Sequence, residues 1–251
     1  MAHDLHYEDR LDGTRRLSGM HVEALWRYPV KSLGGESLAS ADVTADGVRG
    51  DRVVHVRGAR GPLTGRTRPG LLTLPVATGD DGIPRVDGHR WDSAAAAAAV
   101  RERGGDDATL VADTSPQRFD VLNLLVATDE AVARFGHDVR RLRPNILISD
   151  VATGAEASWP GHALAIGDVL IGIDSLRARC IVTTIDPESG AQDLTVLRRI
   201  RDEFGGEIAL NSWVIEPGTV RVGDTVEVTD SDAVPADLGG WIVGSPYPHA
   251  S

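Results

Sequence analysis

The chain has 251 residues, a net charge of −11 and a single cysteine. Its length allows one large β domain or two smaller ones, with a core that needs no disulfides. The lone cysteine excludes an intrachain disulfide and any zinc or iron–sulfur site held by cysteines alone. The acidic charge argues against nucleic acid and against a membrane surface as partners, because both attract basic proteins.

Residues 1–19 are polar and contain no apolar signal segment, so we expect a flexible tail there. No apolar run approaches the roughly 20 residues of a membrane-spanning helix. One unpaired cysteine suits a reducing compartment, and we expect the protein to be cytoplasmic. Of the 26 basic residues, all but Lys31 are arginine. That position either needs a compact ammonium group or holds a lysine by chance.

Residues 20–115 are predicted to be rich in strands. Strand patterns cover residues 21–26, 38–44, 53–56 and 71–78, and residues 61–69 are predicted to form a loop. The alanine-rich run 93–103 predicts a helix whose side chains are too small to build a core. Lys31 and Ser32 stand at a turn, and Arg52 begins a strand beside Asp51. These polar groups either bind an anion or belong to an exposed loop and an exposed ion pair.

Residues 116–229 are predicted to combine strands with two helices. Strand patterns cover residues 122–127, 146–149, 163–166, 169–173, 207–215, 219–222 and 225–229. Thr128 is expected to cap a helix that ends near Gly136, although the start of that helix can also receive an anion. Residues 193–204 predict an amphipathic helix with an apolar stripe made of Leu194, Leu197, Ile200 and Phe204. Residues 230–251 are predicted to be a C-terminal tail.

Two arginine-rich stretches are candidates for chemistry. In the first, Arg140, Arg141 and Arg143 precede Pro144, and at least one of them can point inward toward an anion, whereas a solvated loop is the default. The second surrounds Cys180, where neighbouring arginines favour the reactive thiolate. Read as a strand, this stretch places Cys180 on one face with Ala178 and on the opposite face from Arg177 and Arg179. That placement suits a metal ligand and a buried hydrophobic residue equally.

Four motifs occur in the order found in the MOSC family, the β-barrel domain related to the C-terminal part of molybdenum cofactor sulfurases and to the mitochondrial amidoxime-reducing component. They are Tyr28-Pro29-Val30-Lys31-Ser32, Arg141-Leu142-Arg143-Pro144-Asn145-Ile146, the stretch from Arg179 to Pro187, and the stretch from Pro217 to Asp224. The resemblance implies a mainly β protein with a few helices. A β-barrel MOSC domain at residues 116–229 would pack against a smaller, barrel-like β domain at residues 20–115.

The same resemblance implies a molybdenum cofactor, which is a pterin dithiolene with a phosphate group. Cys180 would be the catalytic metal ligand, because a soft thiolate suits such a centre. The residues implied to hold the phosphate and the pterin are Lys31, Ser32, Arg52 and Arg143, with Arg179 beside the cysteine. Thr128 and Asn145 match neighbouring positions of the family. Asn211 lies where some relatives have a tyrosine near the metal.

The function implied is an oxidoreductase that reduces N-hydroxylated small molecules by two electrons. With one cysteine in the chain, electrons would come from a separate donor protein. One alternative is a carrier, in which Cys180 holds a persulfide sulfur or the barrel binds the cofactor without turnover. The other is a β-barrel with a buried cysteine and no cofactor.

Overall fold

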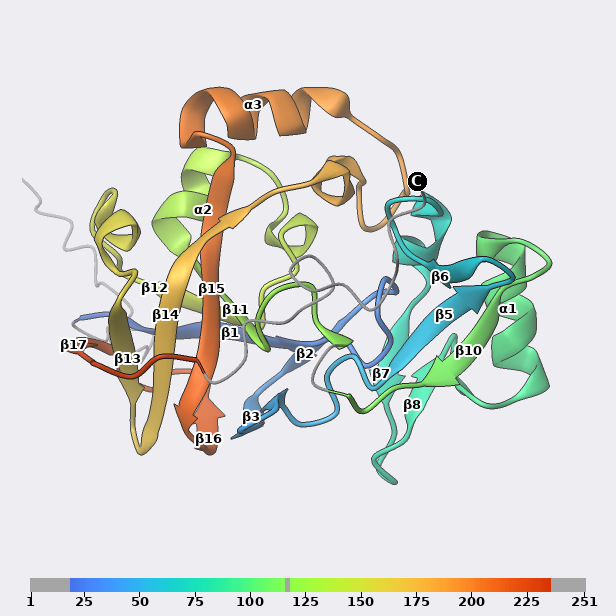
Figure 1. Cartoon of the computed structure of the whole chain (residues 1–251), viewed down its shortest axis with the longest axis horizontal. Coiled ribbons are helices and arrows are strands. Elements are labelled where there is room, and N and C mark those ends of the chain that lie inside the picture. The colour runs from blue at the N-terminus through green and yellow to red at the C-terminus, as the bar shows by residue number, and fades with distance from the viewer. Residues whose placement is uncertain (1–18, 116–117, 236–251) are drawn as a thin grey trace, which may run out of the picture.

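The computed structural model describes residues 19–115 and 118–235, and in these residues it is mainly β with three α-helices, as predicted (Figure 1). The helices are α1 (Ala94–Gly104), α2 (Asp129–Phe135) and α3 (Leu194–Phe204). Short 3-10 turns are η1 (Pro69–Thr73), η3 (Val139–Arg141), η4 (Ala155–Ser158) and η5 (Ile181–Thr184). None of the helices in the described residues is long and apolar enough to span a membrane.

The strands fall into one large sheet and three small ones. Those of the first half are β1 (His21–Arg27), β2 (Glu36–Leu38), β3 (Ser40–Thr44), β4 (Gly47–Val48), β5 (Val54–Gly58), β6 (Gly61–Leu63), β7 (Val76–Thr78), β8 (Pro84–Val86), β9 (His89–Arg90) and β10 (Thr109–Ala112). Those of the second half are β11 (Leu124–Thr128), β12 (Ile146–Ser149), β13 (His162–Ile166), β14 (Val169–Ala178), β15 (Glu207–Glu216), β16 (Gly218–Arg221) and β17 (Glu227–Asp230).

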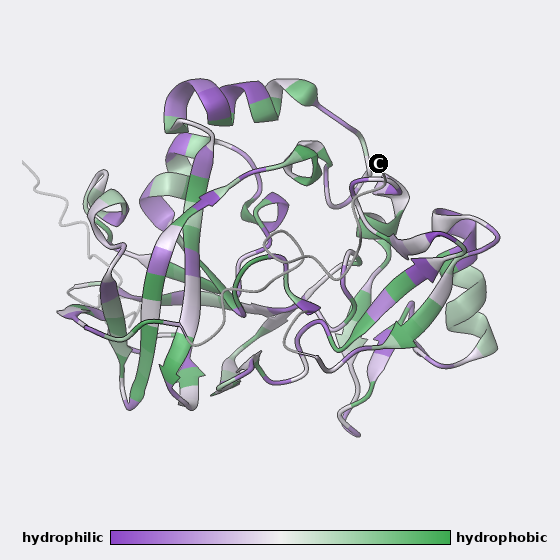
Figure 2. Ribbon diagram, in the orientation of Figure 1, coloured by the Kyte–Doolittle hydropathy of each residue, from purple (hydrophilic) through white to green (hydrophobic). Residues whose placement is uncertain are grey.

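Eight strands form the large sheet, in the order β17-β13-β14-β15-β11-β12-β1-β2. Only the β11–β12 pair is parallel. A bridge between His21 and Thr225 links β1 to the residues just before β17, so the sheet curls toward closure. Figure 2 shows apolar residues recurring along these strands. Their inner face forms the larger core, in which Ile146, Ile171 and Leu210 are fully buried.

A second core lies in the unit that contains β5 to β10 and α1, on the right in Figure 1. Val54 and Val56 of β5 pack there with Leu71 of η1. The helix at residues 93–103 is confirmed, and the Ser93 hydroxyl caps it by accepting a hydrogen bond from the Ala96 backbone N–H. The expectation that its side chains build no core is wrong. Ala96 and Val100 are fully buried, because a helix of small residues packs closely on the sheets beside it.

The two packing units do not coincide with the segments 20–115 and 116–229. Strands β1, β3 and β4 belong to the first segment, yet their residues Val22, Val43 and Val48 lie in the larger core. Strand β3 also pairs with β16 near the end of the chain. The chain therefore starts in the larger unit, contributes Val30 and Leu33 to the second core, and returns to the larger unit with β3 and β4. It builds the rest of the second unit after Val48 and returns to the larger unit with β11.

Three local predictions differ from the structure. Residues 38–44 are divided between β2 and β3, and residues 61–63 of the predicted loop form β6. Residues 71–78 hold the end of η1 and the short β7, because Pro69 starts a 3-10 turn and Pro75 has no N–H for a ladder. Helix α3 forms as predicted, but its buried residues are Val196 and Ile200, and Leu194 is 59% exposed. The apolar stripe of α3 is therefore rotated relative to the predicted one, and it packs on Phe135 of α2.

Replacing Val100 with alanine tests whether α1 supports the second core. The change removes buried methyl groups, so we expect the free energy of unfolding to fall by roughly 1–3 kcal/mol. Urea unfolding measures this, with Val234→Ala as the matched control because Val234 is 80% exposed. The control should stay within about 0.5 kcal/mol of the wild type. Equal effects of the two changes would show that α1 does not contribute to the core.

Candidate functional site

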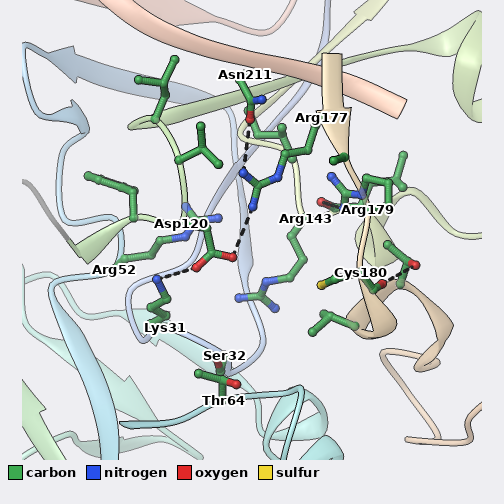
Figure 3. Close-up of a pocket in the computed structure, with 18 of the residues that line it drawn as sticks. Lys31, Ser32, Arg52, Thr64, Asp120, Arg143, Arg177, Arg179, Cys180 and Asn211 are labelled. Atoms are coloured by element: carbon green, nitrogen blue, oxygen red, sulfur yellow. Dashed lines mark hydrogen bonds and ion pairs between the residues drawn. The ribbon is translucent and has the colours of Figure 1, made fainter. Parts of the chain in front are cut away.

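A cavity lies where the connections between the two units meet (Figure 3). Eight of the nine residues expected to form the site line it, namely Lys31, Ser32, Arg52, Arg143, Asn145, Arg179, Cys180 and Asn211. They come from segments separated by more than 100 residues of chain, such as the turn after β1 and the end of β14. The fold therefore brings together residues that the sequence could relate only through family motifs.

Buried Asp51 holds three of the lining segments together. Its side chain is fully buried and accepts a hydrogen bond from the Tyr28 backbone N–H at 2.7 Å. The Asn145 amide donates to the other carboxylate oxygen at 3.3 Å. Arg52 forms an ion pair with that same oxygen. The pair was expected to be exposed if it had no binding role, and the structure instead buries it, which makes Asp51 an anchor for the cavity wall.

Three lining residues have a backbone conformation that side chains disfavour. Ser32, Arg52 and Arg143 have φ values of 69°, 55° and 58°, and the described residues contain only six such non-glycine positions. Each costs of order 1 kcal/mol, so it persists only where surrounding contacts enforce it. Strain of this kind gathers at binding and catalytic sites. Half of the strained positions thus lie on one cavity, which supports a functional role for it.

Asp120 is the centre of the largest charge cluster in the cavity. Lys31 Nζ lies 2.7 Å from one of its carboxylate oxygens. Arg177 and Arg66 lie 3.3 Å and 3.5 Å from the other. These cations hold the pKa of Asp120 far below its usual range, despite the opposing effect of burial. Burial lowers the pKa of Lys31 to about 8.

The opposite wall carries arginine N–H groups that have no acceptor in the described residues. These groups are Nη2 of Arg143 and Nε of Arg179. Arg143 stacks on the Tyr28 ring at 4.2 Å, and Arg179 donates to the Leu142 carbonyl at 2.6 Å. Burial lowers the pKa of both guanidinium groups. Buried donors without partners are costly, so this wall is suited to an anion that would supply the acceptors.

Cys180 lies at the end of the cavity beside these cations, and its residue is partly exposed. The prediction that it lies in a strand is wrong, because β14 ends at Ala178 and Cys180 instead precedes η5. Its carbonyl accepts hydrogen bonds from the Thr183 N–H and hydroxyl. Because the chain leaves the β-ladder at Ala178, side chains no longer alternate between two faces beyond that residue. Arg177 and Arg179 therefore line the same cavity as Cys180 and do not point to an opposite face.

Two further predicted site residues, Asn145 and Asn211, form hydrogen bonds within the cavity wall. The Asn145 amide is 1% exposed and also accepts a hydrogen bond from the Leu125 N–H at 3.2 Å. Asn211 accepts from Arg177 at 3.3 Å and donates to the Ser175 hydroxyl at 3.1 Å. Both side chains therefore position their neighbours as well as lining the cavity.

Thr128 is the predicted site residue that the structure places elsewhere. Its hydroxyl accepts a hydrogen bond from the Ala131 N–H and so caps α2, as expected. The same hydroxyl donates to buried Glu156 at 2.6 Å. Thr128 is fully buried and does not line the cavity. Its hydrogen-bonding capacity is used by the fold, which corrects its assignment to the site.

Five polar lining residues were missed, namely Thr64, Arg66, Asp120, Arg177 and Thr183. Thr64 and Arg66 lie in the stretch predicted to be a plain loop, and Asp120 precedes a strand without any recognisable motif. Arg177 stands three residues before Cys180 and was set aside by the strand alternation. The sequence carries little signal for these residues. Asp120 becomes the counter-ion of Lys31 only because folding brings the two side chains together.

Two sequence-family profiles together cover all the residues that line the cavity. The profile of the MOSC N-terminal β-barrel domain matches residues 19–134, and the profile of the MOSC domain matches residues 114–227. The chain belongs to the MOSC-domain family. Among curated relatives, mitochondrial amidoxime-reducing component 1 from Mus musculus is 27% identical, over 82% of this chain and 81% of that protein. The Homo sapiens protein of that name is 26% identical, over 82% of each.

A molybdenum cofactor sulfurase from Bombyx mori is 28% identical to this MOSC-domain protein over 35% of the chain and 10% of the sulfurase. Among solved structures, the YuaD protein from Bacillus subtilis covers 85% of this chain and 97% of its own, with 14% identity and a TM-score of 0.44. The two family profiles confirm the MOSC domain and the N-terminal barrel domain expected from the sequence.

Thr128→Ala should destabilise the fold of this MOSC-domain protein without changing its cavity. Loss of the cap, with Glu156 left unpaired, should lower the free energy of unfolding by about 1–3 kcal/mol. Phosphate affinity, measured by calorimetry on folded protein, should not change. Thr128→Ser retains the hydroxyl and should behave like the wild type in both measurements. A tenfold loss of phosphate affinity in the alanine variant would place Thr128 back in the site.

Lys31 should make stability depend on pH. Its pKa is about 8 in the folded protein against 10.5 for an ordinary lysine. Between these values the unfolded chain holds more protons, so the free energy of unfolding should rise with pH. Comparing wild type with Lys31→Met by urea unfolding between about pH 8 and 10 isolates this contribution. The rise should be smaller in the variant, and parallel pH profiles would contradict the lowered pKa.

Proposed function

We propose that this MOSC-domain protein binds a molybdenum cofactor and reduces N-hydroxylated small molecules. The observation that carries the proposal is the position of the only thiol in the chain, at a cavity lined by one lysine and five arginines. Relatives named amidoxime-reducing component and molybdenum cofactor sulfurase point in the same direction. Fold and family alone do not determine chemistry, so the proposal depends on the cavity itself.

The donor set of the cavity fits such a cofactor. Cys180 offers the soft thiolate that molybdenum accepts. The unpartnered N–H groups of Arg143 and Arg179 suit the acceptor atoms of an anionic pterin dithiolene. The described residues contain no group of three or more His, Cys, Asp or Glu residues placed to hold a metal ion. Molybdenum at Cys180 would therefore take its other ligands from the cofactor.

The cavity has a volume of about 130 Å³, less than the roughly 300–1,000 Å³ of typical small-molecule sites. Ion pairs between Asp120 and the cations around it restrict this volume. Entry of a group as large as a pterin would require these pairs to open. Lys31, Ser32 and Arg52 would then hold the phosphate end, with Arg143 and Arg179 nearer the thiol.

A second cavity of about 500 Å³ adjoins the first and shares Leu72, Arg143 and Val182 with it. Its walls include the aromatic side chains of Trp26 and Tyr28. The volume and the partly apolar walls suit a small-molecule substrate. We assign the body of the N-hydroxylated compound to this cavity, with its N–O group toward the shared Arg143.

The bound cofactor would supply the two-electron redox chemistry. Cleavage of the N–O bond uses two electrons and two protons and yields an N–H group and water. The chain's own residues would bind, orient and neutralise charge. The electrons would come from a separate donor protein, because one cysteine cannot hold an iron–sulfur cluster.

Cys180→Ala tests the proposal directly. Wild type and variant are produced in cells that make the cofactor, and molybdenum and pterin are measured per chain together with amidoxime reduction by an artificial electron donor. The variant should lose molybdenum and activity, whereas Asp202→Asn, which alters an exposed ion pair with Arg201, should keep both. A fully active Cys180→Ala protein would reject a metal-ligand role for the thiol.

The same preparation distinguishes the carrier alternative. A persulfide on Cys180 adds about 32 Da to the intact mass. Wild-type protein with that added mass and no molybdenum would favour the carrier and reject the reductase. Wild-type protein with molybdenum and no added mass would favour the reductase.

A further inference from the structure

The second cavity, beside the thiol cavity, has a buried tyrosine hydroxyl in its wall that the fold does not use. Tyr28 is 2% exposed and lines this cavity. Its hydroxyl has no hydrogen-bond partner in the described residues. Buried polar groups without a partner are uncommon in folded proteins and reduce stability. A ligand that supplies the missing partner would account for such a group.

The other charged groups around the second cavity are accounted for. Arg140 and Arg141 each form an ion pair with a carboxylate, at 2.8 Å and 3.0 Å. Arg143 has an N–H group without an acceptor, but it also lines the thiol cavity, where the cofactor is proposed to bind. Tyr28 does not line the thiol cavity. A cofactor bound there leaves the hydroxyl without a partner, so the partner has to come from the second cavity.

Tyr28 is held firmly in its place. Its backbone N–H donates to Asp51 at 2.7 Å, and its carbonyl accepts from the Arg52 N–H at 2.8 Å. The Arg143 guanidinium stacks on the ring at 4.2 Å. A Cβ atom at Gly35 would lie 2.5 Å from two ring carbons, so the ring needs glycine at that position. The hydroxyl is therefore presented by a fixed ring, as a precise binding group requires.

The hydroxyl acts as a donor under ordinary conditions. Burial raises the pKa of Tyr28 to about 12, so the group stays protonated at neutral pH. An N-hydroxylated compound offers an oxygen that accepts a hydrogen bond, whereas the N–H product of its reduction lacks that oxygen. A tyrosine donor in the substrate cavity can therefore distinguish the two compounds.

We infer that the Tyr28 hydroxyl donates a hydrogen bond to the oxygen of the substrate's N–O group, so that the second cavity prefers the substrate to its N–H product. The inference rests on the proposed function. Arg143 stacks on the Tyr28 ring and bounds both cavities, which places this oxygen on the side of the second cavity that adjoins the thiol cavity. Because reduction removes the oxygen as water, the product loses the hydrogen bond and is released more readily. Tyr28 is thus a substrate-binding residue.

Tyr28→Phe tests the inference, because it removes the hydroxyl and keeps the ring. The probes are benzohydroxamic acid and benzamide, which differ only by the N–O oxygen. Calorimetry without an electron donor measures both affinities. Wild-type protein should bind the hydroxamic acid at least about tenfold more tightly than the amide, and the variant should lose at least about fivefold of this preference. Both proteins are made with and without the cofactor, because a hydroxamic acid can also bind a metal.

Ile185→Val is the matched control within the same cavity. It removes one methyl group from the wall and no hydrogen-bond donor, so it should change both affinities alike and leave the preference unaltered. The melting temperature of Tyr28→Phe provides a second readout. The variant should melt no lower than wild type, because a buried group without a partner has been removed.

Three results would overturn the inference. The first is wild-type protein that does not prefer the hydroxamic acid, and the second is an unchanged preference in Tyr28→Phe in either preparation. The third is a Tyr28→Phe protein that fails to fold or melts more than about 3 °C below wild type, since its hydroxyl would then serve the fold. Failure of the proposed function would appear separately, as absence of molybdenum from wild-type protein made in cells that supply the cofactor.

Discussion

The buried carboxylate of Asp51 is the contact on which the geometry of the site depends. It joins the turn after β1, the strained Arg52 and the loop before β12 through Tyr28 and Asn145. Removing one partner from such a buried charge network typically costs several kcal/mol, because the remaining charges lose their solvation as well as their partner. The strain at Arg52 is sustained by these contacts. The cavity wall is therefore a property of one network and not of separate loops.

This rigid wall carries more positive than negative charge. Six cations line the cavity with a single carboxylate, although the whole chain has a net charge of −11. Concentrating cations in one partly closed cleft focuses the field there and attracts anions despite the acidic surface elsewhere. The overall charge disfavours a polyanionic partner, but it says nothing about a small anion at a local site. Arginine suits the wall that needs fixed, directional donors, as at Arg143 and Arg179.

The sequence predicts the long elements well, because their signals are local. The cap at Thr128 and the helices predicted at residues 93–103 and 193–204 depend on neighbouring residues alone. Cys180 was misplaced because a period of two continues in the sequence after β14 has left its ladder. Thr128 was assigned to the site by the family resemblance, and its hydrogen bond to Glu156 could not be foreseen because it links residues 28 positions apart. Asp120 and Arg66 were missed for the same reason, since their partners are defined only by the folded chain.

Asp51 and Asp120 illustrate how burial separates structural from exchangeable charge pairs. Both carboxylates pair with arginine side chains, Asp51 with Arg52 and Asp120 with Arg66 and Arg177. An ion pair stabilises the fold only while both partners stay together. If solvent or a ligand replaces one partner, the pair no longer adds to the free energy of unfolding. Closed on all sides, Asp51 contributes to the fold in every state of the protein. Open to the cavity, Asp120 contributes less to stability than a fully buried pair of the same geometry would, because solvent reaches its carboxylate and Arg66.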